Sequence, residues 1–250
     1  MADNLSEEPA GTVRVWDLPI RLFHWLLVVL VLMSFITAEG EWPDVHLPAW
    51  SPGGASVVPH MTLHIWCGYG ILVLLLFRAG WGVIGSSTSR FTGFVRGPAA
   101  IAAYVRGFLR RPAVFFTGHN PLGAVMVLVL LTALLLQAVT GLFAKDEDDV
   151  YGIAVGPLHG RVSEATGKAL THFHHLGHEL IEDLVYLHVL ANLFYWLVRR
   201  ENLIGAMFTG RRRLEPGQSA TAVAFAANTR AVAVFALAVA VVWAALVVRF

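Results

Sequence analysis

Two histidines, His174 and His188, lie fourteen residues apart within one long apolar stretch. An α-helix rises about 1.5 Å and turns about 100° per residue, so this spacing gives roughly 21 Å of rise and only about 40° of rotation. The two imidazoles are therefore predicted to lie on nearly the same face of one helix. Their separation would be about two-thirds of a bilayer core, which is about 30 Å thick. Because imidazole is a common metal ligand, one helix could hold a metal group near each side of a membrane.

The composition indicates a membrane protein. Hydrophobic residues make up 56% of the 250 positions and charged residues only 14%, whereas soluble domains carry about 25% charged residues. A stretch of about 20 apolar residues is long enough to cross a bilayer as a helix. Five such stretches are predicted, at residues 20–38, 63–84, 121–144, 174–198 and 231–248.

Basic residues are unevenly distributed among the segments that flank these stretches. They gather in residues 1–22, 78–118 and 199–213. Residues 39–60 contain no lysine or arginine, and residues 145–173, with the acidic cluster at 146–149, carry more acidic than basic side chains. Cytoplasmic loops are enriched in Lys and Arg, so the N-terminus and the other two basic segments are predicted to be cytoplasmic. The acidic segments and the C-terminus are then expected on the opposite side.

Four histidines can be paired by their predicted depth in the membrane. His24 and His188 lie toward the cytoplasmic side, on the first and fourth stretches. His64 and His174 lie at the outer starts of the second and fourth stretches. Each pair joins two helices, as a six-coordinate haem iron inside a four-helix bundle requires. The sequence therefore predicts two haems, and the single Cys67 excludes the C-x-x-C-H attachment of c-type haem.

Neighbouring histidines leave some of these ligand assignments open. His178 is ten residues from His188, about 80° away around the helix, and is the alternative to His174. His60 lies about one helical turn before His64 and is the alternative on the second stretch. The outer cluster could instead form a zinc or copper site. That cluster consists of His172, His174, His175 and His178.

The same histidines lie in motifs that resemble a known family. The motifs are VWDLPIRLFHW, LHIWCGYGILVLLLFRAGWGVIGS, GHNPLGAVMVLVLL, FHHLGHELIEDLVYLHV and RRENLIGAMFTGRRR, which occur in this order across about residues 13–213. The chain resembles bacterial dihaem b-type cytochromes, namely the cytochrome b subunit of nickel–iron hydrogenases and its relatives in the cytochrome b561 superfamily. In that family the first and second helices each supply one haem ligand and the fourth supplies two. The matching positions here are His24, His64, His174 and His188.

The resemblance implies an electron-transfer function. Members of the family pass electrons from a water-soluble partner on the outer face to the quinone pool. The implied partners are a hydrogenase small subunit, a c-type cytochrome or a similar redox subunit, together with quinone and membrane lipid; no nucleic acid is expected. The implied location is the bacterial inner membrane. The hydrogenase members usually have four core helices, so the fifth stretch is extra or peripheral here.

Four further residues are candidates for cofactor or quinone contacts. Arg21 and Arg78 could pair with haem propionates, since Arg makes bidentate contacts with carboxylates, although basic residues are also ordinary at this face. His119 and Asn120 precede the third stretch at the cytoplasmic side, where they could hydrogen-bond a quinone carbonyl. Asn120 also fits a helix N-cap before Pro121.

The expected architecture is an all-α integral membrane protein. Residues 1–213 are predicted to form a four-helix, haem-binding transmembrane bundle, and residues 214–250 a linker and an extra transmembrane helix. Bis-imidazole iron has no open coordination position, so the predicted haems carry electrons and do not transform substrates. The alternatives are a stand-alone quinone-linked oxidoreductase of the superoxide-oxidising type, a metal transporter that uses the histidine cluster, and a membrane anchor without a cofactor.

Gly68 and Gly70, which follow His64, would let a flat macrocycle approach the second helix closely.

Overall fold

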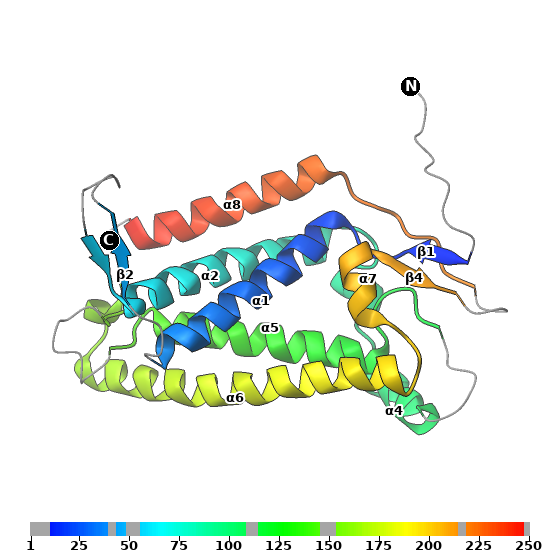
Figure 1. Ribbon diagram of the computed structural model, residues 1–250, viewed down its shortest axis with the longest axis horizontal. Helices are drawn as coiled ribbons and strands as arrows, with labels where there is room; N and C mark the ends of the chain where they lie inside the picture. Colours follow the sequence, from blue (N-terminus) through cyan, green and yellow to red (C-terminus); the bar gives the residue numbers. More distant parts are fainter. Residues whose placement is uncertain are drawn as a thin grey trace. The chain divides into compact units, whose positions relative to one another are not determined.

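The computed structural model describes residues 11–39, 44–48, 56–108, 115–145, 154–214 and 219–247, and Figure 1 labels most of its elements. The long helices are α1 (Leu18–Ala38), α2 (His60–Ile84), α5 (Pro121–Gly141), α6 (Glu164–Leu197) and α8 (Asn228–Val247). The short helices are α3 (Phe91–Phe94), α4 (Pro98–Gly107), α7 (Leu203–Thr209) and the 3-10 turn η1 (His159–Arg161). The strands are β1 (Thr12–Arg14), β2 (Val45–Leu47), β3 (Ser56–Val58) and β4 (Arg211–Arg213).

Within the described residues, the five long helices are each long and apolar enough to cross a membrane. This confirms the predicted all-α membrane architecture. A helix satisfies all of its backbone hydrogen bonds internally, which lipid requires of any segment that crosses it. Large apolar side chains such as Val83, Leu197 and Trp243 are 68%, 72% and 67% exposed. On such surfaces lipid chains take the place that a protein core takes in a soluble domain.

One predicted boundary is wrong, because α6 begins ten residues before the predicted start at His174. The predicted loop at 145–173 therefore ends where α6 starts, at Glu164. Ser163 caps the first turn, since its Oγ accepts a hydrogen bond from the amide of Thr166 at 3.2 Å. A pair between Glu164 and Lys168, 3.2 Å apart, supports the same turn. His174 thus lies ten residues inside the helix, while the acidic cluster at 146–149 lies outside the described residues.

Short antiparallel ribbons, which the sequence did not predict, join some of the helix ends. β1 pairs with β4, with Val13 opposite Arg212 (Figure 1). β2 pairs with β3, with His46 opposite Val57. The first ribbon ties the segment before α1 to the segment after α7, so the basic run at 211–213 is held in an ordered strand.

The chain divides into two compact units. The first takes the described parts of Met1–Phe23, Arg78–Val129 and Leu184–Val234, and the second takes those of His24–Phe77, Leu130–Asp183 and Phe235–Phe250. Each long helix therefore contributes one part to each unit. The predicted boundary between residues 213 and 214 stays a prediction.

Asp17 organises the packing of the first unit. Its Oδ1 accepts a hydrogen bond from the amide of Ile20 at 2.8 Å, which caps the first turn of α1. Its Oδ2 accepts from the indole Nε1 of Trp81 at 3.1 Å and from the hydroxyl of Ser89 at 3.4 Å. Asp17, Trp81 and Ser89 are all buried. One carboxylate thus joins the start of α1 to the end of α2 and to the turn that follows α2.

The second unit packs through close helix contacts. A Cβ placed on Gly70 would lie 2.8 Å from Cδ1 of Leu30, so a larger residue there would push α1 away from α2. Small residues allow such contacts between membrane helices. In the same unit, Phe77 and Phe235 meet with ring centroids 6.2 Å apart, so α8 packs against α2.

Candidate functional site

The second unit brings two of the predicted ligands together. The rings of His64 on α2 and His174 on α6 have centroids 6.2 Å apart and planes at 89° to each other. A bond between a metal and an imidazole nitrogen is about 2.0–2.1 Å, so two imidazoles bound on opposite sides of one ion leave centroids roughly 6 Å apart. The observed separation therefore fits one metal ion between the two rings.

Backbone carbonyls fix which ring nitrogen of each histidine carries the proton. His64 Nδ1 lies 3.0 Å from the carbonyl oxygen of Ser34, and His174 Nδ1 lies 3.0 Å from that of Gln137. A carbonyl can only accept, so Nδ1 is the donor in both rings and Nε2 keeps its lone pair. Metal-bound histidines commonly hold their second ring nitrogen in this way. His64 Nε2 is therefore prepared to bind a metal, whereas His174 Nε2 accepts from the side-chain amide of Gln137 at 3.5 Å, and that long hydrogen bond would give way to a metal.

A threonine follows three residues after each of these carbonyls. The hydroxyl of Thr37 donates to the Ser34 carbonyl at 3.2 Å, and that of Thr140 donates to the Gln137 carbonyl at 3.0 Å. The two sides of the site therefore share one arrangement, with a histidine from one helix held by the backbone of another. Sequence reasoning missed these four residues; their signal was the polar pairs Ser34/Thr37 and Gln137/Thr140 at i, i+3 in otherwise apolar helices.

A cavity of about 280 Å³ contains both rings, and its lining belongs entirely to the second unit. Gly68 lines it and has nothing within 4 Å of where a Cβ would lie. At Gly141, a Cβ would lie 2.8 Å from Cε1 of His174. Two imidazole donors, apolar walls and these glycines fit a flat iron porphyrin. Of the two predicted glycines, Gly68 lines the cavity, whereas Gly70 contacts α1.

The alternative ligands contact acidic residues. His178 Nε2 lies 3.4 Å from Glu39 Oε1, and His60 Nδ1 lies 3.4 Å from Asp44 Oδ1. Over the part of the chain that the structure covers, no group of three or more His, Cys, Asp or Glu side chains is arranged to hold a metal ion. The zinc or copper alternative therefore finds no support among those residues.

The two remaining predicted ligands belong to different units. His24 lies in the second unit, with its ring edge-on to Trp25 at a centroid distance of 4.9 Å. His188 lies in the first unit, where Asn192 Nδ2 donates to its backbone carbonyl at 2.7 Å. Pairing of His24 with His188 remains a prediction. Both His174 and His188 do lie on α6, which runs without a break between them.

The two candidate arginines have different surroundings. Arg21 donates through Nε to the carbonyl of Met207 at 3.3 Å and through Nη2 to that of Phe208, so it holds the end of α7. Arg78 is only 2% exposed. Its guanidinium lies 4.7 Å from the ring centre of Phe91 and 5.8 Å from that of Phe94. Neither terminal nitrogen of Arg78 has a hydrogen-bond partner within the described parts of the chain.

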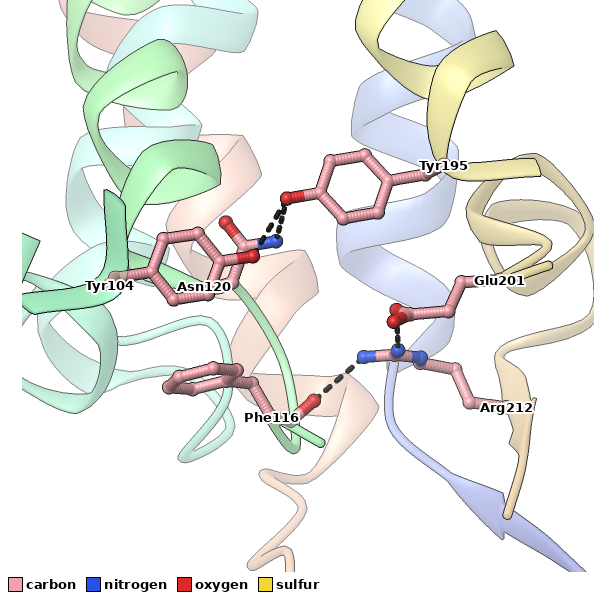
Figure 2. Close-up of polar contacts among 6 residues, drawn as sticks. All are labelled: Tyr104, Phe116, Asn120, Tyr195, Glu201 and Arg212. Carbon is pink, nitrogen blue, oxygen red and sulfur yellow. Dashed lines mark hydrogen bonds and ion pairs between the residues drawn. The ribbon is translucent and has the colours of Figure 1, made fainter. Parts of the chain in front are cut away.

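The candidate quinone residues also lie in the first unit. The His119 ring lies between Trp16 and Phe94, with both centroid distances 4.7 Å. Asn120 Oδ1 accepts from the amide of Gly123 at 2.8 Å, which confirms that Asn120 is the N-cap of α5. Its Nδ2 donates to the hydroxyl of Tyr195 at 2.9 Å (Figure 2).

Figure 2 shows residues beside Asn120 that sequence reasoning missed. Tyr104 on α4 meets Tyr195 on α6, with their hydroxyl oxygens 2.8 Å apart. Arg212 on β4 donates to Glu201 Oε2 at 2.8 Å and to the carbonyl of Phe116 at 2.7 Å. Burial lowers the pKa of Arg212, and the neighbouring Glu201 carboxylate opposes that shift. No sequence spacing joins these residues, because they come from five parts of the chain: α4, the segment before α5, α6, the segment between α6 and α7, and β4.

Comparisons with known proteins place the chain in one family. Residues 15–210 match the model of the family described as prokaryotic cytochrome b561. A probable Ni/Fe-hydrogenase B-type cytochrome subunit from Rhizobium leguminosarum bv. viciae is 26% identical over 80% of this chain and 89% of that protein. A protein of the same description from Azotobacter chroococcum is 26% identical over 80% of this chain and 88% of its own length.

A third relative comes from Escherichia coli K12. It is described as a probable Ni/Fe-hydrogenase 1 B-type cytochrome subunit and is 25% identical over 79% of this chain and 89% of its length. No solved structure matches the chain significantly. The family model, these relatives and the five long apolar helices agree. The chain belongs to the prokaryotic cytochrome b561 family and is a multi-pass membrane cytochrome b, with haem b as its cofactor and electron transfer as its function.

Proposed function

We propose that the protein carries two b-type haems and transfers electrons across the bilayer, between a redox partner outside the cytoplasm and the quinone pool. The observation that carries this proposal is the His64–His174 pair, with ring centroids 6.2 Å apart and both Nδ1 atoms facing backbone carbonyls. These two residues would hold the outer haem through Nε2. Haem iron supplies one-electron oxidation and reduction, and two imidazole ligands leave no position open for a substrate.

The proposed inner haem is held by His24 and His188. Support comes from the unbroken α6, on which His188 follows His174 by fourteen residues. Fourteen residues return a helix to nearly the same face, about 21 Å further along. The protein would thereby carry an imidazole at each of two positions along one helix. The pairing of His24 with His188 rests on their predicted depths in the membrane and on the family resemblance.

Arg78 supports an inner site from a second helix. It follows His64 on α2 by fourteen residues, the same interval that separates His188 from His174 on α6. Each helix would therefore carry its second residue on nearly the same face as its first. A buried guanidinium whose two terminal nitrogens have no hydrogen-bond partner within the described residues suits a carboxylate. We therefore assign Arg78 as the main candidate to bind a propionate of the inner haem, with Arg21 as the second.

The proposed electron route ends at quinone, near His119 and Asn120. The similarity to hydrogenase cytochrome subunits suggests a Ni/Fe hydrogenase small subunit as the electron donor. A c-type cytochrome is the alternative partner. The proposed orientation places the N-terminus in the cytoplasm, because the first unit carries most of the arginines.

Haem content tests the outer site. The protein is purified from haem-replete cells, and its haem per chain is measured by the pyridine haemochrome method. We expect two haems in the wild type and one in His64→Ala and in His174→Ala, because either change removes one of the two imidazoles that would hold the outer haem. His172→Ala is the matched control, since His172 is exposed on the same helix. Two haems retained in both ligand variants would exclude the assignment, and a colourless wild type would exclude the whole proposal.

A further inference from the structure

Three polar side chains from separate segments meet at one point of the first unit. Tyr104 comes from α4, Tyr195 from α6, and Asn120 precedes α5. The two tyrosine hydroxyls are 2.8 Å apart, and Asn120 Nδ2 lies 2.9 Å from the Tyr195 hydroxyl (Figure 2). Asn120 is itself fixed, because its Oδ1 caps α5 through the amide of Gly123. Hydrogen bonds therefore connect the two tyrosines to the start of α5.

The donors and acceptors of this cluster do not balance. The amide of Asn120 can only donate at Nδ2, so the Tyr195 oxygen accepts there. Only one phenol proton can occupy the contact between Tyr104 and Tyr195, yet the pair has two. One phenol O–H is thus left with no acceptor among the described residues. The spare O–H belongs to Tyr104 when Tyr195 donates across the contact, and to Tyr195 when Tyr104 donates. Tyr195 is only 9% exposed and Tyr104 is half-buried, and an unused donor in a fully buried place costs about 1–3 kcal/mol.

Aromatic rings flank the tyrosine pair. The Tyr104 ring contacts those of Phe116 and Phe108, with centroids 5.5 Å and 5.8 Å apart. Phe108 also stacks on Phe194 at 5.7 Å, with only 20° between the ring planes. Flat, apolar molecules pack well against such rings.

The nearest ion pair does not use the spare proton. Glu201 accepts from Arg212 at 2.8 Å, and Arg212 also donates to the carbonyl of Phe116 (Figure 2). Neither tyrosine hydroxyl bonds to the Glu201 side chain within the described residues. Burial, with the hydrogen bond to Tyr195, raises the pKa of Tyr104. The Tyr104 phenol therefore stays protonated and able to donate across the physiological pH range.

We propose that the Tyr104–Tyr195 pair donates its spare O–H to a carbonyl oxygen of a quinone, with Asn120 as the positioning residue that holds Tyr195. A quinone is flat, largely apolar and carries carbonyl acceptors without donors, which matches the one donor and the aromatic lining. The inference rests on the proposed quinone function. It assigns the hydrogen bond to the quinone to the two phenols and not to Asn120, because the Asn120 side chain already bonds to Gly123 and Tyr195.

The phenol binds the quinone and is not consumed. Reduction of one quinone to quinol takes two electrons and two protons. The two electrons would be supplied one at a time by haem iron, which would be oxidised. The two protons would come from the aqueous phase on the side of the membrane where the quinone binds. The O–H keeps its proton throughout and donates a hydrogen bond to the oxygen on which negative charge develops.

Kinetics of haem reoxidation test the assignment. Dithionite-reduced protein, freed of excess reductant, is mixed with decylubiquinone or with menadione at increasing concentration. In Tyr104→Phe we expect the apparent KM to rise about three- to tenfold, the range for one lost hydrogen bond between neutral groups, with a much smaller change in the limiting rate. Tyr186→Phe is the control, because Tyr186 is 59% exposed on the same helix as Tyr195.

Infrared difference spectra separate a direct contact from a structural effect. Loss of the O–H donor should raise the carbonyl stretching frequency of the bound quinone in Tyr104→Phe and leave it unchanged in Tyr186→Phe. Haem content and melting temperature are compared for every variant, and Tyr195→Phe provides a second route to the same shift. An unchanged KM and an unchanged carbonyl frequency in Tyr104→Phe and Tyr195→Phe would overturn the inference while leaving the quinone function standing. If neither quinone reoxidises the wild-type haem, the proposed function fails and this inference fails with it.

Discussion

Arg78 shows how a single residue can indicate a missing partner. A guanidinium that is 2% exposed has lost most of its contact with water. Two aromatic faces compensate part of that loss, but neither terminal nitrogen has a hydrogen bond within the described residues. Asp17, the carboxylate that acts on Arg78 electrostatically, already accepts bonds from Ile20, Trp81 and Ser89. A carboxylate from outside the chain would complete the site.

Replacing Arg78 with glutamine should lower the midpoint potential of one haem. Removal of a positive charge favours the oxidised iron. A unit charge about 10 Å away contributes roughly 1.7 kcal/mol at an effective dielectric constant of about 20. Since 1.4 kcal/mol corresponds to about 59 mV for one electron, we expect a shift of several tens of millivolts. Spectroelectrochemical titration measures it, with Arg96→Gln, which removes an exposed arginine, as the control. Equal potentials in the two variants would contradict the assignment of Arg78.

At the same scale, the sequence predicts which residues could act but not what holds them. The relation of His174 to His188 on one helix follows from helix geometry, and the pairing of His64 with His174 follows from their predicted depth in the membrane, so both could be predicted. The carbonyls of Ser34 and Gln137, which set the tautomers, are backbone groups that every residue has. Only their contacts with the histidine rings in the folded structure distinguish these two carbonyls from others. No pattern of side chains in the sequence predicts those contacts.

At the scale of elements, the end of α5 must pass close to His174. A Cβ on Gly141 would lie 2.8 Å from Cε1 of that ring, which is closer than real Cβ contacts. Gly141→Ala should therefore displace the imidazole and lower the occupancy of the outer haem by at least half. Haem per chain measures this effect. Gly160→Ala is the control in the same unit, because a Cβ there meets nothing within 4 Å. Full occupancy in Gly141→Ala would show that the ring has room to move.

Helix existence could be predicted better than helix ends. The apolar runs gave all five long helices, because hydropathy and length decide whether a segment can cross a bilayer. The start of α6 was missed because polar and charged residues interrupt the segment 164–173, and hydropathy does not detect a helix that extends beyond the apolar run. A capping signal was present in Ser163, with Glu164 following in the first turn. The contact of α4 with α6 through Tyr104 and Tyr195 depends on tertiary packing and left no periodic signal.

At the scale of the whole molecule, charge separates the two units. The first unit contains the described arginines Arg14, Arg21, Arg78, Arg90, Arg96, Arg106, Arg199, Arg200, Arg211, Arg212, Arg213 and Arg230. The described acidic residues of the second unit are Glu39, Asp44, Glu164, Glu179, Glu182 and Asp183. Retention of basic segments on the cytoplasmic side sets the orientation of membrane proteins. This charge distribution supports the proposed orientation, with the first unit on the cytoplasmic side.

Cysteine labelling tests this orientation directly. In a Cys67→Ser background, His46→Cys places a thiol on β2 of the second unit, and Arg96→Cys places one after α3 of the first; both positions are exposed. A membrane-impermeant maleimide added to intact spheroplasts should label the thiol at position 46 and spare the one at 96 until the membrane is permeabilised. The expected contrast is near-complete labelling against background labelling, because the bilayer excludes the reagent. The reverse pattern would place the second unit in the cytoplasm, and the proposed outer partner would then have no access to the His64–His174 site.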